Sequence, residues 1–176
     1  MRIFLIRHGE TTGDVEDRYG GSYDDHLTNK GKLQIEQTSK KLIGKNIEII
    51  YTSPLIRAKE TAEIIDSKLG CQIKVVDDIR ERHYGVLGGL TKSEAVEKYP
   101  DAVEAHKDPL NTDPEGESYA DFHKRVIKAF ELITEQNYNI VAIASHDGPI
   151  KRILNHLGEE IPKKIDDGGI IELNVA

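Results

Sequence analysis

The chain has 176 residues, of which 31% are charged and 38% hydrophobic, and its formal net charge is −7 with histidine neutral. This length suits one domain with a hydrophobic core, and the composition is that of a globular protein. The negative charge argues against binding nucleic acid or an anionic membrane through overall charge, and a single cysteine excludes an internal disulfide and a multi-cysteine zinc site. We therefore expect one cytoplasmic domain over residues 1–176 that binds neither nucleic acid nor membranes.

Short continuous apolar runs along the chain predict strands that are covered on both faces. Segments of helical composition alternate with most of these runs, which is typical of an α/β fold with a mainly parallel sheet. The predicted strands are residues 3–6, 47–51, 73–76, 140–144 and 170–175, and the predicted helices are 32–42, 54–69, 92–99, 119–133 and 148–157.

Three of the predicted helices begin at recognisable capping residues. Ser53 before Pro54 is typical of an N-cap followed by proline in the first helical position. Thr91 has a glutamate three residues later, which is the spacing of a capping box, and Ser118 precedes an amphipathic helix. The starts of these helices are therefore expected at those residues.

The segment from residue 80 to 117 is polar, rich in glycine and proline, and longer than an ordinary connection in an α/β domain. Long insertions of this kind often form lids or substrate loops. We expect this segment to be such an insertion within the single domain.

Charged and polar residues follow the predicted strands where each one ends. Arg7 and His8 follow the first strand, Arg57 follows the second, Glu81 comes a few residues after the third, and His146 follows the fourth. Ligands of open α/β sheets bind outside the carboxyl ends of the strands, so these side chains are expected to meet in one crevice. Arginine donates paired hydrogen bonds to phosphate, and the cluster therefore predicts an anion site, most simply for phosphate. The pattern alone does not decide whether that site is catalytic.

The order of several motifs resembles that of the histidine phosphatase superfamily, which contains the cofactor-dependent phosphoglycerate mutases. The resemblance covers residue 1 to about residue 157 and implies a three-layer, Rossmann-like α/β sandwich with a central, mainly parallel sheet. It also implies catalysis through a phosphohistidine with no required metal. The matching segments are Arg7-His8-Gly9-Glu10-Thr11, Ser53-Pro54-Leu55 with Arg57-Ala58 and Thr61-Ala62, Glu81, and Ser145-His146.

The resemblance assigns roles to these residues by position. His8 would be the nucleophile that holds the phosphoryl group covalently. Arg7, Arg57 and His146 would surround the phosphoryl oxygens and stabilise their charge in the transition state. Glu81 would act as general acid for the leaving oxygen and then as base for the acceptor, a role that favours a raised pKa.

The segment that begins at Glu81 is similar to the signature of the phosphoglycerate mutase branch. The resemblance implies interconversion of 3- and 2-phosphoglycerate, with 2,3-bisphosphoglycerate priming His8. The residues whose positions match substrate-binding positions of those mutases are Arg82, Tyr84, Lys92, Arg18, Gly20 and Gly21.

Several departures from the mutase pattern favour a phosphatase over a mutase. Lys107-Asp108 stands where mutases carry an Arg-Arg pair, Asp14 stands where the family usually has a phosphate-binding asparagine, and Asp147-Gly148-Pro149 replaces the mutase Gly-Asn-Ser. The chain is also shorter than a typical mutase and lacks its C-terminal tail. A more open site favours hydrolysis over retention of an intermediate.

Three functions therefore stay open from the sequence. A phosphoglycerate mutase comes first, a metal-independent phosphatase acting on small phosphomonoesters comes second, and a module that only binds a phosphorylated ligand comes third. In each case the expected partner is a small phosphorylated metabolite, and a homodimer is possible.

Overall fold

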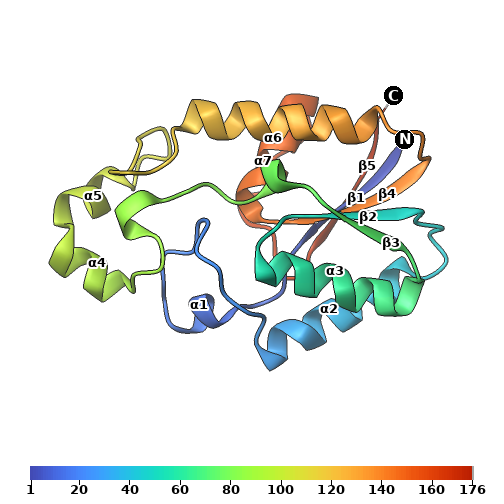
Figure 1. Cartoon of the computed structure of the whole chain (residues 1–176), viewed down its shortest axis with the longest axis horizontal. Helices are drawn as coiled ribbons and strands as arrows, with labels where there is room; N and C mark the ends of the chain where they lie inside the picture. The colour runs from blue at the N-terminus through green and yellow to red at the C-terminus, as the bar shows by residue number, and fades with distance from the viewer. Residues whose placement is uncertain (176) are drawn as a thin grey trace.

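One five-stranded sheet organises the chain, with the strand order β3-β2-β4-β1-β5. The computed structural model describes residues 1–175. Figure 1 shows the sheet at the right of the molecule and a smaller lobe at the left. The strands are β1 (Arg2–Arg7), β2 (Ile49–Thr52), β3 (Gln72–Val75), β4 (Ile140–Ser145) and β5 (Ile170–Asn174). Neighbouring strands are parallel except for β5, which runs antiparallel to β1 at the edge.

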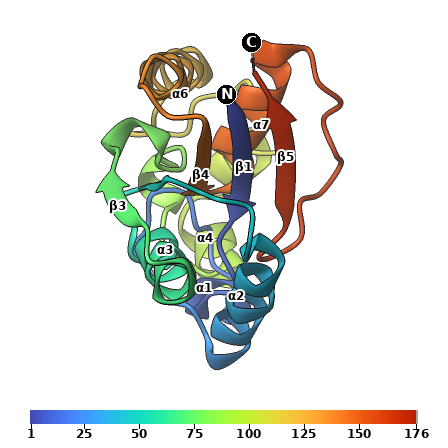
Figure 2. The same ribbon diagram turned by 90° about the vertical axis from the view of Figure 1, so that its right-hand side faces the viewer.

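Helices cover both faces of the sheet and make the three layers that the sequence predicts (Figure 2). The helices α2 (Asn29–Leu42) and α3 (Ile56–Leu69) pack on one face. The helices α6 (Tyr119–Thr134) and α7 (Asp147–Leu157) pack on the other. The expected α/β sandwich with a mainly parallel sheet is confirmed.

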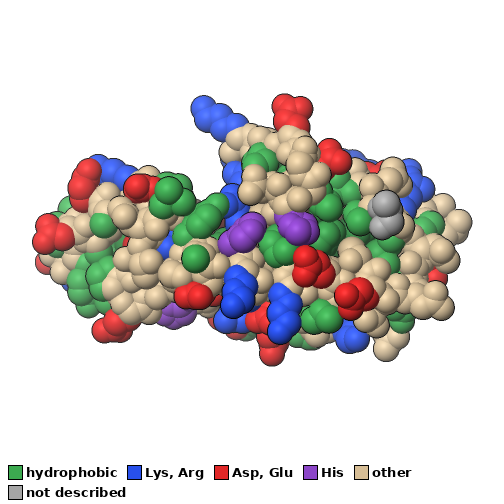
Figure 3. Space-filling model, turned by 90° about the horizontal axis from the view of Figure 1, so that it is seen from above, with side chains coloured by type: hydrophobic (Ala, Val, Ile, Leu, Met, Phe, Trp, Pro, Cys, Tyr) green, Lys and Arg blue, Asp and Glu red, His purple; other side chains and the backbone are tan. Residues whose placement is uncertain are grey.

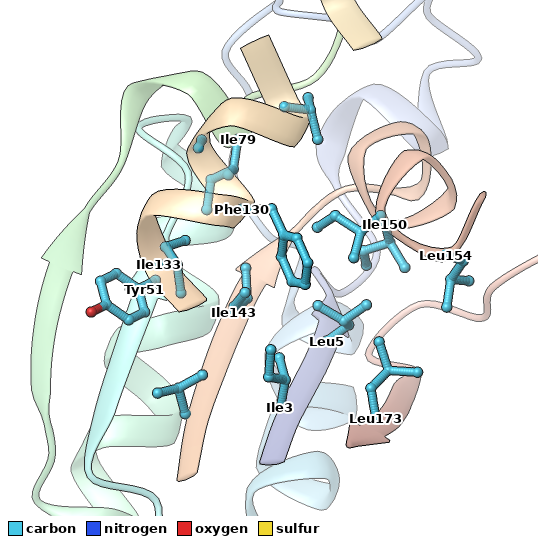
Figure 4. Close-up of a cluster of buried hydrophobic side chains, with 14 of the residues drawn as sticks. Ile3, Leu5, Tyr51, Ile79, Phe130, Ile133, Ile143, Ile150, Leu154 and Leu173 are labelled. Atoms are coloured by element: carbon cyan, nitrogen blue, oxygen red, sulfur yellow. The ribbon is translucent and has the colours of Figure 1, made fainter. Parts of the chain in front are cut away.

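Each face of the sheet has its own hydrophobic core, because successive residues of a strand point to opposite sides. On the β1 strand, Ile3 and Leu5 face α6 and α7, while Phe4 and Ile6 face α2 and α3. Figure 4 shows Leu5 close to Phe130 and Ile150 in the first of these cores. Burial on both faces explains why β1, β2 and β4 are apolar runs rather than alternating ones. The edge strands β3 and β5 are mostly exposed or only partly buried, so the expectation that every strand is covered on both faces is wrong for them.

The predicted insertion is largely structured. It contains the 3-10 turn η2 (Gly85–Leu87) and the helices α4 (Lys92–Lys98) and α5 (Pro100–Ala105). With the one-turn helix α1 (Thr12–Val15), these elements form the left-hand lobe of Figure 1. The lobe has a small core of its own that includes Tyr19, Leu87 and Ala95. Whether residues 80–117 act as a lid stays a prediction.

The start of the α3 helix differs from the sequence prediction in an informative way. The α3 helix begins at Ile56 and not at Pro54, and its N-cap is Leu55. Ser53 instead uses its hydroxyl within the site, where Oγ lies 2.7 Å from Nε2 of His146. The predicted caps of α4 and α6 are confirmed, since Thr91 forms a capping box with Glu94 and Ser118 accepts from Asp121 N.

Two further differences concern helices that the sequence pattern concealed. The α2 helix begins three residues earlier than expected, at Asn29, with Thr28 as its N-cap. The α1 and α5 helices were not expected. Pro100 ends α4 and occupies the first turn of α5, because proline cannot continue a helix but fits its start.

The strand register brings the candidate residues to one edge. Arg7 lies opposite Ser145, and Thr52 lies opposite Ala144, so His8, Ser53 and His146 all emerge at the carboxyl ends of parallel strands. Figure 3 shows that the surface is indented between the lobe with α4 and α5 and the rest of the molecule, with acidic and basic side chains interspersed. Within residues 1–175 no helix combines the length and apolar character needed to cross a bilayer.

Candidate active site

A cavity of about 240 Å³ opens at this edge of the sheet. It is lined by a histidine, three arginines and four carboxyl groups, so the cavity gathers positive charge but its carboxyl groups outnumber its arginines. These residues are His8, Arg7, Arg18, Arg57, Asp14, Asp25, Glu81 and Asp147, and Gly20, Gly21 and Tyr84 complete much of the wall.

The His8 ring is buried and fixed at both nitrogens. Its Nδ1 lies 2.8 Å from the carbonyl oxygen of Gly9, which can only accept, so we assign the ring proton to Nδ1. Its Nε2 accepts from Nε of Arg57 at 3.2 Å and therefore carries the lone pair. Burial lowers the pKa of His8 well below its usual value, and the positive charge of Arg57 lowers it further. A neutral imidazole with a directed lone pair is a competent nucleophile.

The Arg57 guanidinium is held by the loop between α1 and α2. It donates to the backbone carbonyls of Tyr23 and Gly21, at 2.6 and 2.7 Å, and forms a 2.9 Å ion pair with Asp25. Both members of the ion pair are 4% exposed, so each compensates the other's burial. Asp25 also accepts from Gly13 N at 3.2 Å. This network fixes Arg57 against His8.

Arg7 enters the cavity from the end of β1 and is tied to the segment before β5. Its NH1 donates to the carbonyl of Ile165 and lies 3.1 Å from a carboxylate oxygen of Asp167. Its buried Nε has no partner among residues 1–175, which leaves a donor for an anion. Burial raises the pKa of Asp167, and the charge of Arg7 lowers it.

His146 lies edge-to-face against His8, with 5.2 Å between the ring centroids. Its Nε2 is 2.7 Å from Ser53 Oγ, and its buried Nδ1 has no partner within the described part of the chain. Burial lowers the pKa of His146 well below its usual value, with a further contribution from Arg57. His146 is therefore a neutral hydrogen-bonding group beside His8.

Glu81 is a buried carboxyl group that also lines the cavity. It accepts from Arg82 N at 2.9 Å and from Gly148 N, in the first turn of α7, at 3.0 Å. Burial raises the pKa of Glu81, although both N–H groups and Arg57 favour its charged form. A carboxyl group with a raised pKa can donate a proton and later accept one.

The other predicted binding residues divide into two sets. Arg18, Gly20, Gly21, Tyr84 and Asp14 line the cavity, while Arg82 and Lys92 do not. The Arg82 guanidinium donates to the carbonyls of Glu117, Pro109 and Asn111 and so fixes the end of the insertion. The Lys92 ammonium lies 3.2 Å from the centre of the Tyr19 ring.

Asp14 lies in the cavity wall, and its carboxylate is engaged by the cap of α1. Its Oδ2 accepts from the backbone N and from Oγ1 of Thr11, at 2.8 and 2.9 Å. The capping box therefore explains how a carboxylate is accommodated where the family usually has asparagine.

Sequence reasoning missed three residues that hold the predicted site residues in place. Asp25 orients Arg57, Ser53 contacts His146, and Asp167 pairs with Arg7. Asp25 and Asp167 lie in loops without periodicity, so their spacing carries no signal. Ser53 before Pro54 does carry a signal, but that signal predicts a helix cap and not a contact with His146.

Comparison with protein families places this geometry in context. The family model described as Histidine phosphatase superfamily (branch 1) matches residues 3–173. That match spans nearly the whole chain and includes His8, Arg57, Glu81 and His146.

Individual proteins and solved structures are also similar to this chain. The uncharacterized phosphatase PhoE of Bacillus subtilis (strain 168) is 37% identical over 108 residues, which cover 61% of this chain and 56% of that protein. A 2,3-bisphosphoglycerate-dependent phosphoglycerate mutase of Corynebacterium jeikeium (strain K411) is 32% identical, covering 98% of this chain and 79% of its own length. The structure of Bacillus stearothermophilus YhfR superposes with a TM-score of 0.90 at 28% identity, covering 99% of this chain and 91% of that one.

Proposed function

Because the chain belongs to the histidine phosphatase superfamily, we propose that it hydrolyses small phosphomonoesters through a phosphohistidine on His8, without a metal. The observation that carries the proposal is the presence of two groups in the lining of one cavity. The Nε2 lone pair of His8 is held beside Arg57, and Glu81, whose pKa is raised, lines the same cavity. Nucleophile, positive charge and proton donor are thus present together.

In the proposed first step, Nε2 of His8 attacks phosphorus and the bond from phosphorus to the ester oxygen breaks. Glu81 gives its proton to the leaving oxygen, and the alcohol departs. Arg7, Arg57 and His146 stabilise the charge of the phosphoryl oxygens during transfer. In the second step water loses a proton to Glu81 and attacks phosphorus, which releases phosphate and restores neutral His8.

The phosphatase is favoured over a mutase by the placement of the cationic side chains. Retaining a bisphosphorylated intermediate requires charge for a second phosphate. Arg82 donates through all three guanidinium nitrogens to backbone carbonyls, Lys92 lies over Tyr19, and Lys107 pairs with Glu104 on the surface. Of the predicted substrate-binding cations other than Arg7 and Arg57, Arg18 lines the cavity.

A phosphoglycerate mutase is the second candidate, supported by the 98% coverage of this chain in the match with the Corynebacterium jeikeium mutase. Phosphorus NMR of the protein in EDTA, with 3-phosphoglycerate and a trace of 2,3-bisphosphoglycerate, separates the two. A phosphatase releases inorganic phosphate as its only phosphorus-containing product. A 2-phosphoglycerate signal that grows ahead of inorganic phosphate would replace our proposal with the mutase.

We expect Asp14→Asn to strengthen phosphate binding several-fold at neutral pH. Asparagine can still accept from Thr11 through its oxygen, while its amide adds a donor to the cavity and removes a negative charge. The inhibition constant of inorganic phosphate, measured between pH 5 and 8, reports the change. Identical constants for the two proteins over that range would show that Asp14 does not repel the bound anion.

We expect Gly148→Ala to lower kcat for an alkyl phosphate by at least about tenfold while the fold is retained. A Cβ on Gly148 would lie 2.2 Å from Oε1 and 3.0 Å from Cδ of Glu81, so the carboxyl group must move. Alanine suits the helix itself, so thermal unfolding should change little. In the control Gly88→Ala, the new Cβ lies 3.5 Å from its nearest neighbour, the Gly85 oxygen. Equal losses in both variants would contradict the steric explanation.

A further inference from the structure

A second cavity of about 160 Å³ adjoins the first on the side of Glu81. Glu81, Tyr84 and Gly148 line both cavities. Since Glu81 is the proposed proton donor to the leaving oxygen, the alcohol half of a bound ester extends past it. The second cavity therefore lies where the leaving group would be accommodated.

The walls of the second cavity combine an apolar surface with two arginines. Tyr119 and Phe122, from the start of α6, supply aromatic rings. The two arginines, Arg82 and Arg152, differ in what they can still bind. The Arg82 guanidinium is used by three backbone carbonyls, as described above.

Arg152 is one helical turn after Gly148 on α7, on the same face of the helix. Its guanidinium carbon lies 4.9 Å from the centre of the Tyr119 ring, which fixes the planar group at the wall. Its buried Nε has no hydrogen-bond partner among residues 1–175. Burial lowers the pKa of Arg152, and the charge of Glu81 opposes this shift. The guanidinium is therefore partly desolvated, and the nearby carboxylate does not fully offset the loss of hydration.

We propose that the second cavity binds the leaving half of the substrate, and that Arg152 binds a carboxylate or other anionic group carried on an apolar, ring-sized body. This inference rests on the proposed phosphatase function. It divides the substrate between two sites: Arg7 and Arg57 take the phosphoryl group, and Arg152 takes the far end of the alcohol. Tyr119 and Phe122 contact the apolar part between them.

A pair of aryl phosphates tests the proposal. The values of kcat/KM for 4-carboxyphenyl phosphate and phenyl phosphate are measured with the unchanged protein and with Arg152→Leu, Arg152→Lys and Arg2→Leu. Dividing the two values within each protein cancels differences in active fraction, and comparing proteins cancels the difference in leaving-group reactivity. Arg2 is the matched control, because it pairs with Glu172 at the opposite end of β1.

We expect the preference for the carboxylated ester to fall at least about tenfold in Arg152→Leu and to return partly in Arg152→Lys. Arg2→Leu should leave both values unchanged. An equal preference in the unchanged protein and Arg152→Leu, or no preference in the unchanged protein, would overturn the role of Arg152.

Failure of the phosphatase function itself has a different signature. The unchanged protein would then hydrolyse neither ester. Dissociation constants of the corresponding aryl phosphonates, which cannot be hydrolysed, would still report the cavity. An Arg152-dependent preference for the carboxylated phosphonate would support the binding site without hydrolysis, and the lack of one would reject it.

Discussion

Replacing His8 with alanine is expected to abolish covalent phosphorylation and to lower kcat by at least about 10⁴-fold, the scale seen when an enzyme loses its nucleophile. The Gly9 carbonyl holds the ring proton on Nδ1, so the lone pair is on Nε2, where it accepts from Nε of Arg57. Within residues 1–175 His8 is the histidine whose Nε2 accepts from Arg57. The adjacent His146 cannot replace it in the same way, because its Nε2 is engaged by Ser53. Water would have to attack the ester directly.

The measurement is rapid acid or base quenching of the protein during turnover of a phosphorus-labelled ester. Label bound to histidine is lost in acid and survives in base, which identifies a phosphohistidine. His156→Ala is the control, since this histidine lies near the end of α7, where its nearest carboxylate is 3.7 Å away, and does not line the cavity. Acid-labile label that persists in the His8→Ala protein would refute the assignment of the nucleophile.

The placement of the two candidate histidines could be predicted because it depends on the sheet alone. Apolar runs locate the strands, and the carboxyl ends of parallel strands lie at one edge. His8 and His146 follow β1 and β4, which are neighbours in register. Their proximity therefore follows from strand positions, without knowledge of any side-chain contact.

The partners of those residues could not be predicted, because they come from loops and from backbone groups. Arg57 is fixed by two carbonyls and by Asp25, and none of these has a periodic pattern. Arg82 is a residue whose predicted role its hydrogen bonds do not reflect. Its position matches a substrate-binding residue of the mutases, yet its guanidinium donates to carbonyls of residues 109–117. A residue type at a given position does not determine which acceptors the surrounding loop presents.

The cause of the raised pKa of Glu81 could not be predicted from the sequence either. A raised pKa for Glu81 was expected from its implied role, but its cause is visible only in the fold. The side chain lies beneath the start of α7, where desolvation outweighs the two N–H groups that favour the carboxylate. Gly148 leaves the space for the carboxyl group, which no motif indicated.

Glu81→Gln is expected to lower kcat/KM by about 10²–10⁴-fold for an ester with a poor leaving group, such as an alkyl phosphate. Glutamine can accept from Arg82 N and Gly148 N but cannot transfer a proton to the ester oxygen. An ester with a good leaving group, such as 4-nitrophenyl phosphate, needs less protonation and should lose less in the transfer step. Steady-state kinetics on both esters, with thermal unfolding as a check on folding, measure the difference.

The pH dependence tests the same residue by an independent route. The first step needs protonated Glu81, so kcat/KM for the alkyl phosphate should fall as the pH rises through the raised pKa of this group. A bound phosphoryl dianion would raise that pKa further by like-charge repulsion. On the acid side, the lowered pKa of His8 keeps the nucleophile neutral well below pH 6.5. Glu81→Gln should remove the decline at higher pH and keep the acid limb. A decline of equal size in both proteins would assign it to another group and reject Glu81 as the proton donor.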